Sequence, residues 1–212
     1  MTAEFPTVTV VAHALARHKL ALLRDRRTGT ALFRQLTREL SLLIGVEATR
    51  DLPTEPAPVE TPLEPTAGEA LVGGAPNIVS ILRAGNGMLD GMLALMPNAR
   101  AGHIGLFRNE ETLRPVEYYL KLPPDIANRP VLVVDPMLAT GGSAVTALDR
   151  LKQAGARHLR FACLIAAPEG LRRLTAAHPD VLVFTAAIDR ALDHRGYIRP
   201  GLGDAGDRYH GT

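Results

Sequence analysis

The first fifty residues carry apolar side chains at the spacing of amphipathic helices. In residues 14–27, and again in residues 30–48, apolar side chains form a stripe that is interrupted by charged residues, as expected of helices that bury one face. The segment Thr28-Gly29-Thr30 lies between them and combines a glycine break with residues that favour a helix start. The pattern therefore predicts two N-terminal helices within residues 1–50.

From position 77 onward, short apolar runs alternate with amphipathic segments. The predicted strands are 78–82, 101–107, 131–134, 159–166 and 181–184, and the predicted helices are 87–96, 143–154 and 169–177. Apolar runs of this length, separated by helices, are typical of βαβ units. We therefore expect an α/β fold with a central, mostly parallel sheet covered by helices on both faces.

Three segments follow neither period. Residues 51–65 contain five prolines, so we expect a surface connection with at most one short edge strand. Residues 108–122 are polar with some alternation, which predicts a projecting hairpin or flap. Residues 191–212 contain five glycines and no helix signal; such a tail is either disordered or fixed by a ligand or by its own packing.

Composition narrows the class of protein. The chain has 212 residues, of which 46% are apolar and 22% charged, and this length fits one domain over 1–212. Its longest stretches without a charged residue are thirteen residues long, too short to cross a bilayer, and no basic-then-apolar leader is present at the N-terminus. A cytoplasmic location is expected. Cys163, the single cysteine, excludes an internal disulfide and lies in an apolar run that predicts a core position.

Charge argues against a nucleic-acid partner. The net charge is +2, from 21 arginines and 3 lysines against 22 acidic residues, and no basic cluster is longer than residues 24–27. This is a weak electrostatic footprint for binding RNA or DNA. Arginine nevertheless suits forked contacts with phosphate, so single arginines beside glycine-rich turns are candidate anion ligands. The seven histidines show no metal-ligand spacing.

The clearest chemical signal follows the apolar run 131–134. The chain continues as Asp135-Pro136-Met137-Leu138-Ala139-Thr140-Gly141-Gly142-Ser143 and then enters a predicted helix. Glycines and hydroxyls before a helix N-terminus can gather N–H and O–H donors around a phosphate, and an acid at a strand end suits ribose hydroxyls. The segment lacks the motifs of P-loop ATPases and dinucleotide-binding folds. A tight turn without any ligand remains the alternative on these residues alone.

The segment 135–143 resembles the phosphoribosyl-pyrophosphate signature of type I phosphoribosyltransferases, in the form found in the uracil phosphoribosyltransferase family. The resemblance continues at 18–20, 47–49, 81–85, 108–112, 166–170, 178–180 and 196–208. Asn86, Ala14 and the pair Tyr209-His210 depart from the pattern, and none of them is a residue with an assigned chemical role.

The resemblance implies a type I phosphoribosyltransferase fold with a β-hairpin flap at 108–122 and a C-terminal hood at 190–212. It implies a transferase that makes UMP and pyrophosphate from uracil and phosphoribosyl pyrophosphate. The catalytic residues would be Asp135, Arg83 and Arg108. Phosphoribosyl pyrophosphate would be bound by Arg83, Arg108, Asp135, Pro136, Met137, Leu138, Ala139, Thr140, Gly141, Gly142, Ser143 and Asp204. Uracil would be bound by Ile198, Gly203, Asp204 and Ala205.

The resemblance also implies Mg²⁺, held mainly by the diphosphate and possible near Asp204, with no direct protein ligand assigned. It further implies at least a homodimer, formed through the N-terminal helices, and allows a GTP effector whose site no motif places. Three alternatives stay open at this stage: an RNA-binding regulator of a pyrimidine operon on the same scaffold, a phosphoribosyltransferase for another base, and a catalytically silent relative.

Overall fold

The core of the molecule is an eight-stranded sheet in a computed structural model that describes residues 4–108 and 115–212. The strands run in the order β1-β10-β9-β7-β4-β5-β6, with β8 beside β9. Their bounds are β1 Val8–Val10, β4 Asn77–Leu82, β5 Ala101–Arg108, β6 Pro115–Lys121, β7 Val131–Val134, β8 Met137–Leu138, β9 Leu159–Ala166 and β10 Leu182–Ile188. The β5–β6 pair is antiparallel and the other pairs are parallel, which confirms the expected mostly parallel sheet.

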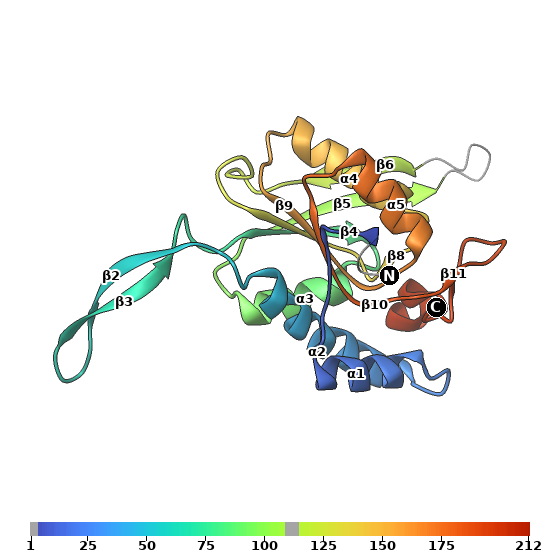
Figure 1. The fold of residues 1–212 in the computed structure, drawn as a ribbon, viewed down its shortest axis with the longest axis horizontal. Helices are drawn as coiled ribbons and strands as arrows, with labels where there is room; N and C mark the ends of the chain where they lie inside the picture. The colour runs from blue at the N-terminus through green and yellow to red at the C-terminus, as the bar shows by residue number, and fades with distance from the viewer. Residues whose placement is uncertain (1–3, 109–114) are drawn as a thin grey trace.

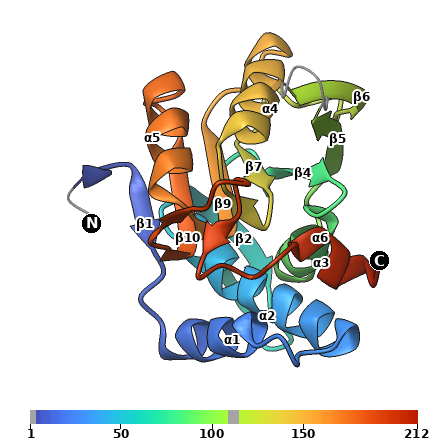
Figure 2. The ribbon, with the colours of Figure 1, turned by 90° about the vertical axis from the view of Figure 1, so that its right-hand side faces the viewer.

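Helices cover both faces of this sheet (Figure 2). The helices α1 (Ala14–Arg24), α2 (Thr30–Ala48) and α3 (Asn86–Leu95) pack on one face, and α4 (Gly142–Gln153) and α5 (Pro168–Ala177) pack on the other. Each layer has its own buried apolar cluster. The two expected N-terminal helices are confirmed, and the central strands are buried on both sides, which explains their unbroken apolar sequence.

The proline-dense segment folds differently from the expectation. Strands β2 (Thr54–Glu60) and β3 (Pro65–Leu71) pair with each other as an antiparallel hairpin that projects away from the sheet (Figure 1). The expected connection with at most one short strand is therefore wrong. Pro56 and Pro58 occupy alternate positions of β2, so both missing N–H groups fall on the edge that faces away from β3, where no hydrogen bond is lost.

The C-terminal segment contains two short strands and a short helix, although its many glycines gave no sign of regular structure. Strands β11 (Ala191–Leu192) and β12 (Ile198–Arg199) form a small antiparallel pair, and α6 (Ala205–His210) follows. The Asp204 carboxylate accepts a hydrogen bond from the N–H of Asp207 at 2.9 Å and so caps α6. The expectation that residues 191–212 contain no helix is wrong.

The predicted flap is described in part. Strands β5 and β6 form its base, with a register shift between Gly105 and Leu106, whereas residues 109–114 lie outside the described residues. Within 4–108 and 115–212, no helix is both long and apolar enough to cross a bilayer.

Candidate active site

The site lies where two neighbouring strands of the parallel sheet end. β4 and β7 are hydrogen-bonded to each other, with Ser80 opposite Val134. After β4 the chain adds β5 on one side, and after β7 it continues to β9 on the other side. Such a change of direction opens a crevice beyond the carboxyl ends of the two strands, where α/β proteins bind their ligands. Arg83 follows β4 and Asp135 follows β7, so this topology places both predicted site residues at the same crevice.

The loop after β7 forms a small concave cradle. Asp135 and residues Met137–Ala144 line a cavity of about 80 Å³. Gly141 has a φ of +77° and precedes the first turn of α4, a conformation that glycine adopts without strain. The N-terminus of α4 therefore points its unpaired backbone N–H groups and its partial positive charge into the cradle, as a phosphate group requires.

A second glycine gives the cradle its support. A Cβ on Gly170, in the first turn of α5, would lie 2.3 Å from the carbonyl oxygen of Ala139. Only a residue without a side chain allows α5 to pack this closely on the loop. Gly170 enters the resemblance only as part of the segment 166–170, with no physical role assigned to it. The one feature of the sequence that points to this residue is a glycine near the start of a helix.

Asp135 has an electrostatic environment unlike that of a surface acid. Its backbone N–H donates to the carbonyl of Ala162. Burial raises the pKa of Asp135 from 3.8 to about 7, and the hydrogen bond from the Met137 backbone offsets only part of this rise. A carboxyl of this kind, beside a phosphate-sized cradle, is a candidate for binding hydroxyl groups of a ligand and not for a structural ion pair.

The C-terminal hood faces the cradle across an open space. One cavity, of about 220 Å³, is lined from the cradle loop by Met137 and Ala139 and from the hood by Arg195, Gly196, Tyr197, Ile198 and Asp204. A Cβ on Gly196 would lie 3.5 Å from the side-chain methyl group of Thr140. The structure thus brings the predicted phosphate-binding and base-binding segments together, although they are far apart in the sequence.

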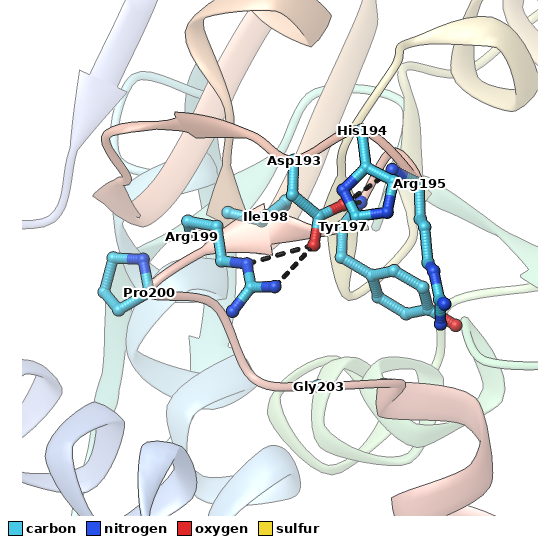
Figure 3. A pocket seen from close by; sticks show the side chains of 8 residues that line it. All are labelled: Asp193, His194, Arg195, Tyr197, Ile198, Arg199, Pro200 and Gly203. Carbon is cyan, nitrogen blue, oxygen red and sulfur yellow. Dashed lines mark hydrogen bonds and ion pairs between the residues drawn. The ribbon is translucent and has the colours of Figure 1, made fainter.

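An adjoining cavity of about 290 Å³ lies within the hood itself (Figure 3). It shares Arg195, Tyr197 and Ile198 with the 220 Å³ cavity, and its lining also includes Gly203. Figure 3 shows the side chains of Arg195 and Tyr197 extending from the hairpin toward the level of Gly203, while Arg199 turns to an ion pair with Asp193 at 2.7 Å. Sequence reasoning did not assign a role to Arg195 or Tyr197. The available signal was their position just before Ile198: Tyr197 directly precedes it, and Arg195 lies three residues before it.

The turn that carries Arg83 packs against both sides of the site. A Cβ on Gly85 would lie 2.6 Å from the carbonyl oxygen of Val134, next to Asp135, and one on Gly206 of α6 would lie 3.8 Å from Ala84. Arg83 itself is exposed and does not line the cavities described above.

The structure places three other predicted residues in different ways. Arg108 ends β5, and its side chain lies outside the described part of the chain. Ala205 is 1% exposed and lines none of the three cavities described above. Asp204 lines the 220 Å³ cavity while one of its oxygens caps α6, which leaves the other oxygen for a ligand.

The unusual Asn86 has a structural role. The Ser80 hydroxyl donates to its side-chain oxygen at 2.9 Å and lies 2.8 Å from Nδ1 of His103. The three side chains tie the first turn of α3 to β4 and β5, beneath the Arg83 turn.

Comparison with known proteins assigns the chain to a family. The family model described as uracil phosphoribosyltransferase matches residues 10–212. The chain belongs to the uracil phosphoribosyltransferase family. Among curated members, the uracil phosphoribosyltransferase of Brucella anthropi is 60% identical and that of Brucella abortus 58% identical, each over 97% of this chain and 99% of the relative. The expected family is confirmed.

Solved structures share the fold of this member of the uracil phosphoribosyltransferase family. The AQ2163 protein of Aquifex aeolicus superposes with a TM-score of 0.92 and 36% identity, over 97% of this chain and 98% of that one. An adenine phosphoribosyltransferase of Trypanosoma brucei, solved with AMP, pyrophosphate and ribose-5-phosphate, shares the fold at a TM-score of 0.58 and 12% identity, over 90% and 87% of the two chains. The expected type I phosphoribosyltransferase fold is confirmed.

Proposed function

We propose that this protein transfers the 5-phosphoribosyl group of phosphoribosyl pyrophosphate to uracil, giving UMP and pyrophosphate in pyrimidine salvage. The observation that carries the proposal is the cavity in which the cradle after β7 meets the C-terminal hood, in a chain of this family. The two walls of this cavity differ in chemistry. One wall, Met137 and Ala139, belongs to the loop whose phosphate donors line the smaller cavity beside it, and the other wall offers backbone groups of the hood for a flat base.

The cradle and Asp135 bind the phosphoribosyl group in this proposal. The backbone and hydroxyl donors of Ala139–Ser143 hold the 5′-phosphate, and the Asp135 carboxylate accepts hydrogen bonds from the ribose hydroxyls. Pro136, Met137 and Leu138 shape the loop between them. A ribose held at both ends presents its anomeric carbon to the hood. This fixed orientation of the reacting groups increases the rate of the reaction.

Arginines neutralise the diphosphate as it leaves. Cleavage at the anomeric carbon leaves positive charge on the ribose and adds negative charge to the departing group, and preorganised cations stabilise that charge most effectively. Arg83, exposed beside the crevice, and Arg108, at the base of the flap, are assigned this role. Closure of the flap brings Arg108 to the substrate and excludes water.

The hood recognises uracil through its backbone. Uracil alternates carbonyl acceptors with N–H donors, and the amides and carbonyls of Ile198, Gly203, Asp204 and Ala205 can match that edge without a charged side chain. Gly203 has a φ of +73°, which allows the chain to approach the base closely. A site built on these hydrogen bonds rejects cytosine, whose amino group leaves donors unpaired.

Magnesium fits this site as a companion of the diphosphate. The carboxylates of Asp135 and Asp204 border the cavities, and carboxylate oxygen is a donor that Mg²⁺ accepts. Asp204 would hold the ion together with oxygens of the substrate. When bound, it supplies Lewis-acid stabilisation of the diphosphate charge.

The proposed function is tested by the purified protein with phosphoribosyl pyrophosphate and each of three bases. UMP should form from uracil, and no nucleotide should form from orotate or hypoxanthine. Turnover of hypoxanthine with none of uracil would show that the base assignment is wrong while the fold is right. Arg83→Ala should lower turnover strongly, whereas Arg100→Ala, which removes a surface partner of Asp125, serves as the matched control.

We also propose a homodimer. Apolar side chains remain exposed on α1 and α2, including Leu15 (52%) and Val46 (51%), and the β2–β3 hairpin is exposed along almost its whole length. A two-stranded hairpin with so little buried surface is marginally stable alone, so a second subunit would stabilise it. Light scattering should give twice the monomer mass.

The cytoplasmic location and the GTP effector remain predictions, and adding GTP to the assay tests the effector.

A further inference from the structure

An ion pair between a buried carboxylate and a partly buried arginine lies behind the hood, away from the three cavities of the site; its arginine lines a separate cavity of about 480 Å³ beside α1 and β10. Asp189, just after β10, is 5% exposed. Arg24, the last residue of α1, meets it with two hydrogen bonds, Nη1 to Oδ2 at 2.8 Å and Nη2 to Oδ1 at 2.5 Å. A buried carboxylate is tolerated only with such a partner and with further hydrogen bonds. The proposed reaction uses neither residue.

The further hydrogen bonds come from one residue of the hood. The N–H of Gly201 donates to Oδ2 of Asp189 at 2.9 Å, and the carbonyl of Gly201 accepts from Nη1 of Arg24 at 2.9 Å. The ion pair therefore satisfies both backbone polar groups of Gly201, whose φ is +70°. A Cβ at this position would lie 2.1 Å from the carbonyl oxygen of Ile198, so Gly201 packs directly against the backbone assigned to base recognition.

A second arginine fixes the chain just beyond. Nη1 of Arg208, in α6, donates to the carbonyls of Leu202 at 2.9 Å and Leu23 at 2.6 Å, and its Nη2 donates to the carbonyl of Asp25 at 2.7 Å. Its guanidinium lies 4.4 Å from the centre of the Phe33 ring. The end of α1 and the loop after it therefore support the hood from Gly201 to α6.

We propose that Arg24 and Asp189 are positioning residues for base recognition, because they fix the backbone between Ile198 and Gly203. The inference rests on the proposed function and deepens it. Backbone groups read a base only when they are held in register with it, and a displacement of about 1 Å weakens several hydrogen bonds at once. The cradle for the phosphoribosyl group lies on a different loop. Loss of the ion pair should therefore impair uracil and spare phosphoribosyl pyrophosphate.

The test measures KM for each substrate separately in Arg24→Lys and Asp189→Asn. Lysine keeps the charge but lacks the fork that reaches Asp189 and Gly201 together, and asparagine keeps an acceptor for Gly201 without the charge. Both variants should raise KM for uracil about tenfold or more and change KM for phosphoribosyl pyrophosphate by about twofold at most. Both variants should also lower the ratio of kcat/KM for uracil to kcat/KM for cytosine.

The matched control is Arg27→Ala, which removes an exposed arginine paired with Asp25 in the loop after α1; its side chain is 85% exposed. It should leave both KM values unchanged. Circular dichroism checks folding, and if Asp189→Asn is unfolded, Arg24→Lys decides the question.

Equal increases in both KM values, or no increase in KM for uracil, would refute the positioning role. A wild-type protein that does not convert uracil would instead refute the proposed function, and this inference with it. An active wild type with unaffected variants refutes the positioning role alone.

Discussion

Replacing Asp135 with asparagine separates the chemical role of this carboxyl from its effect on folding. Burial raises the pKa of Asp135 to about 7, so its ionised form is less stable in the folded protein than in the unfolded chain. Asparagine has the same shape and keeps an acceptor for the Met137 N–H, but carries no charge. The substitution should therefore remove a cost to folding while it removes the ligand for ribose.

The sign and size of the folding effect follow from the two pKa values. Below about pH 4 the carboxyl is neutral in both states, and no cost arises. The pKa of Asp135 is 3.8 in the unfolded chain and about 7 in the folded protein. Between these two pH values the carboxyl ionises in the unfolded chain and stays protonated in the folded one, so ionisation increasingly favours the unfolded chain. The cost to folding is complete above about pH 7. At about 1.4 kcal/mol per pKa unit the limit is about 4 kcal/mol, and because Asp135 is only half-buried the cost lies below it.

Two measurements on ligand-free and substrate-bearing protein check this reasoning. In urea, the D135N variant should be at least as stable as the wild type at pH 8, and the difference should shrink toward pH 5. In the uracil assay, kcat/KM should fall about a hundredfold or more, because two hydrogen bonds from ribose hydroxyls to a charged acceptor are each worth about 1.5 kcal/mol or more.

The control is Asp180→Asn, which removes an exposed carboxylate paired with Lys152 at 2.7 Å. Its turnover should match that of the wild type, and it should not gain stability at pH 8. If D135N instead lost stability and activity in parallel at pH 8, Asp135 would be a structural residue and the argument from burial would fail.

Three further predictions concern the cradle and the core. Gly141→Ala should raise KM for phosphoribosyl pyrophosphate and lower the free energy of unfolding by about 1–3 kcal/mol, since an alanine at φ +77° is strained and its Cβ would lie 2.9 Å from the carbonyl of Gly170; an unchanged KM would contradict this. Gly170→Ala should raise KM for phosphoribosyl pyrophosphate more than Gly141→Ala does, because its Cβ would lie 2.3 Å from the carbonyl of Ala139. Steady-state kinetics, together with thermal unfolding of the same variant, would show this increase. Cys163 should resist a thiol reagent at pH 8 until the protein is unfolded, because burial raises its pKa to about 12; rapid labelling of the native protein would be the contrary result.

The sequence predicted the parts of the fold that depend on local patterns. β7 and β9 were placed at their observed bounds because strands buried on both faces are unbroken apolar runs. The cradle was predictable for a similar reason, since its acid, glycines and hydroxyls are consecutive residues.

Features that depend on distant pairing or on a few residues were not predicted. β1 has three residues and exists because it pairs with β10. The β2–β3 hairpin was misjudged because prolines forbid pairing on only one edge of a strand. The ion pair of Arg24 with Asp189 joins residues 165 positions apart, and no local pattern indicates which partners such side chains will find.

The hood is completed by contacts between the first two helices and residues of α6. Nε of Arg34 in α2 donates to the carbonyl of Tyr209 at 2.7 Å, and Arg208 reaches back to Leu23. The described strands of the sheet end by Ile188, whereas these contacts need residues 208 and 209. A protein shortened by residues 205–212 would therefore keep the segments of its sheet and lose the part of the hood that Arg34 and Arg208 hold in place.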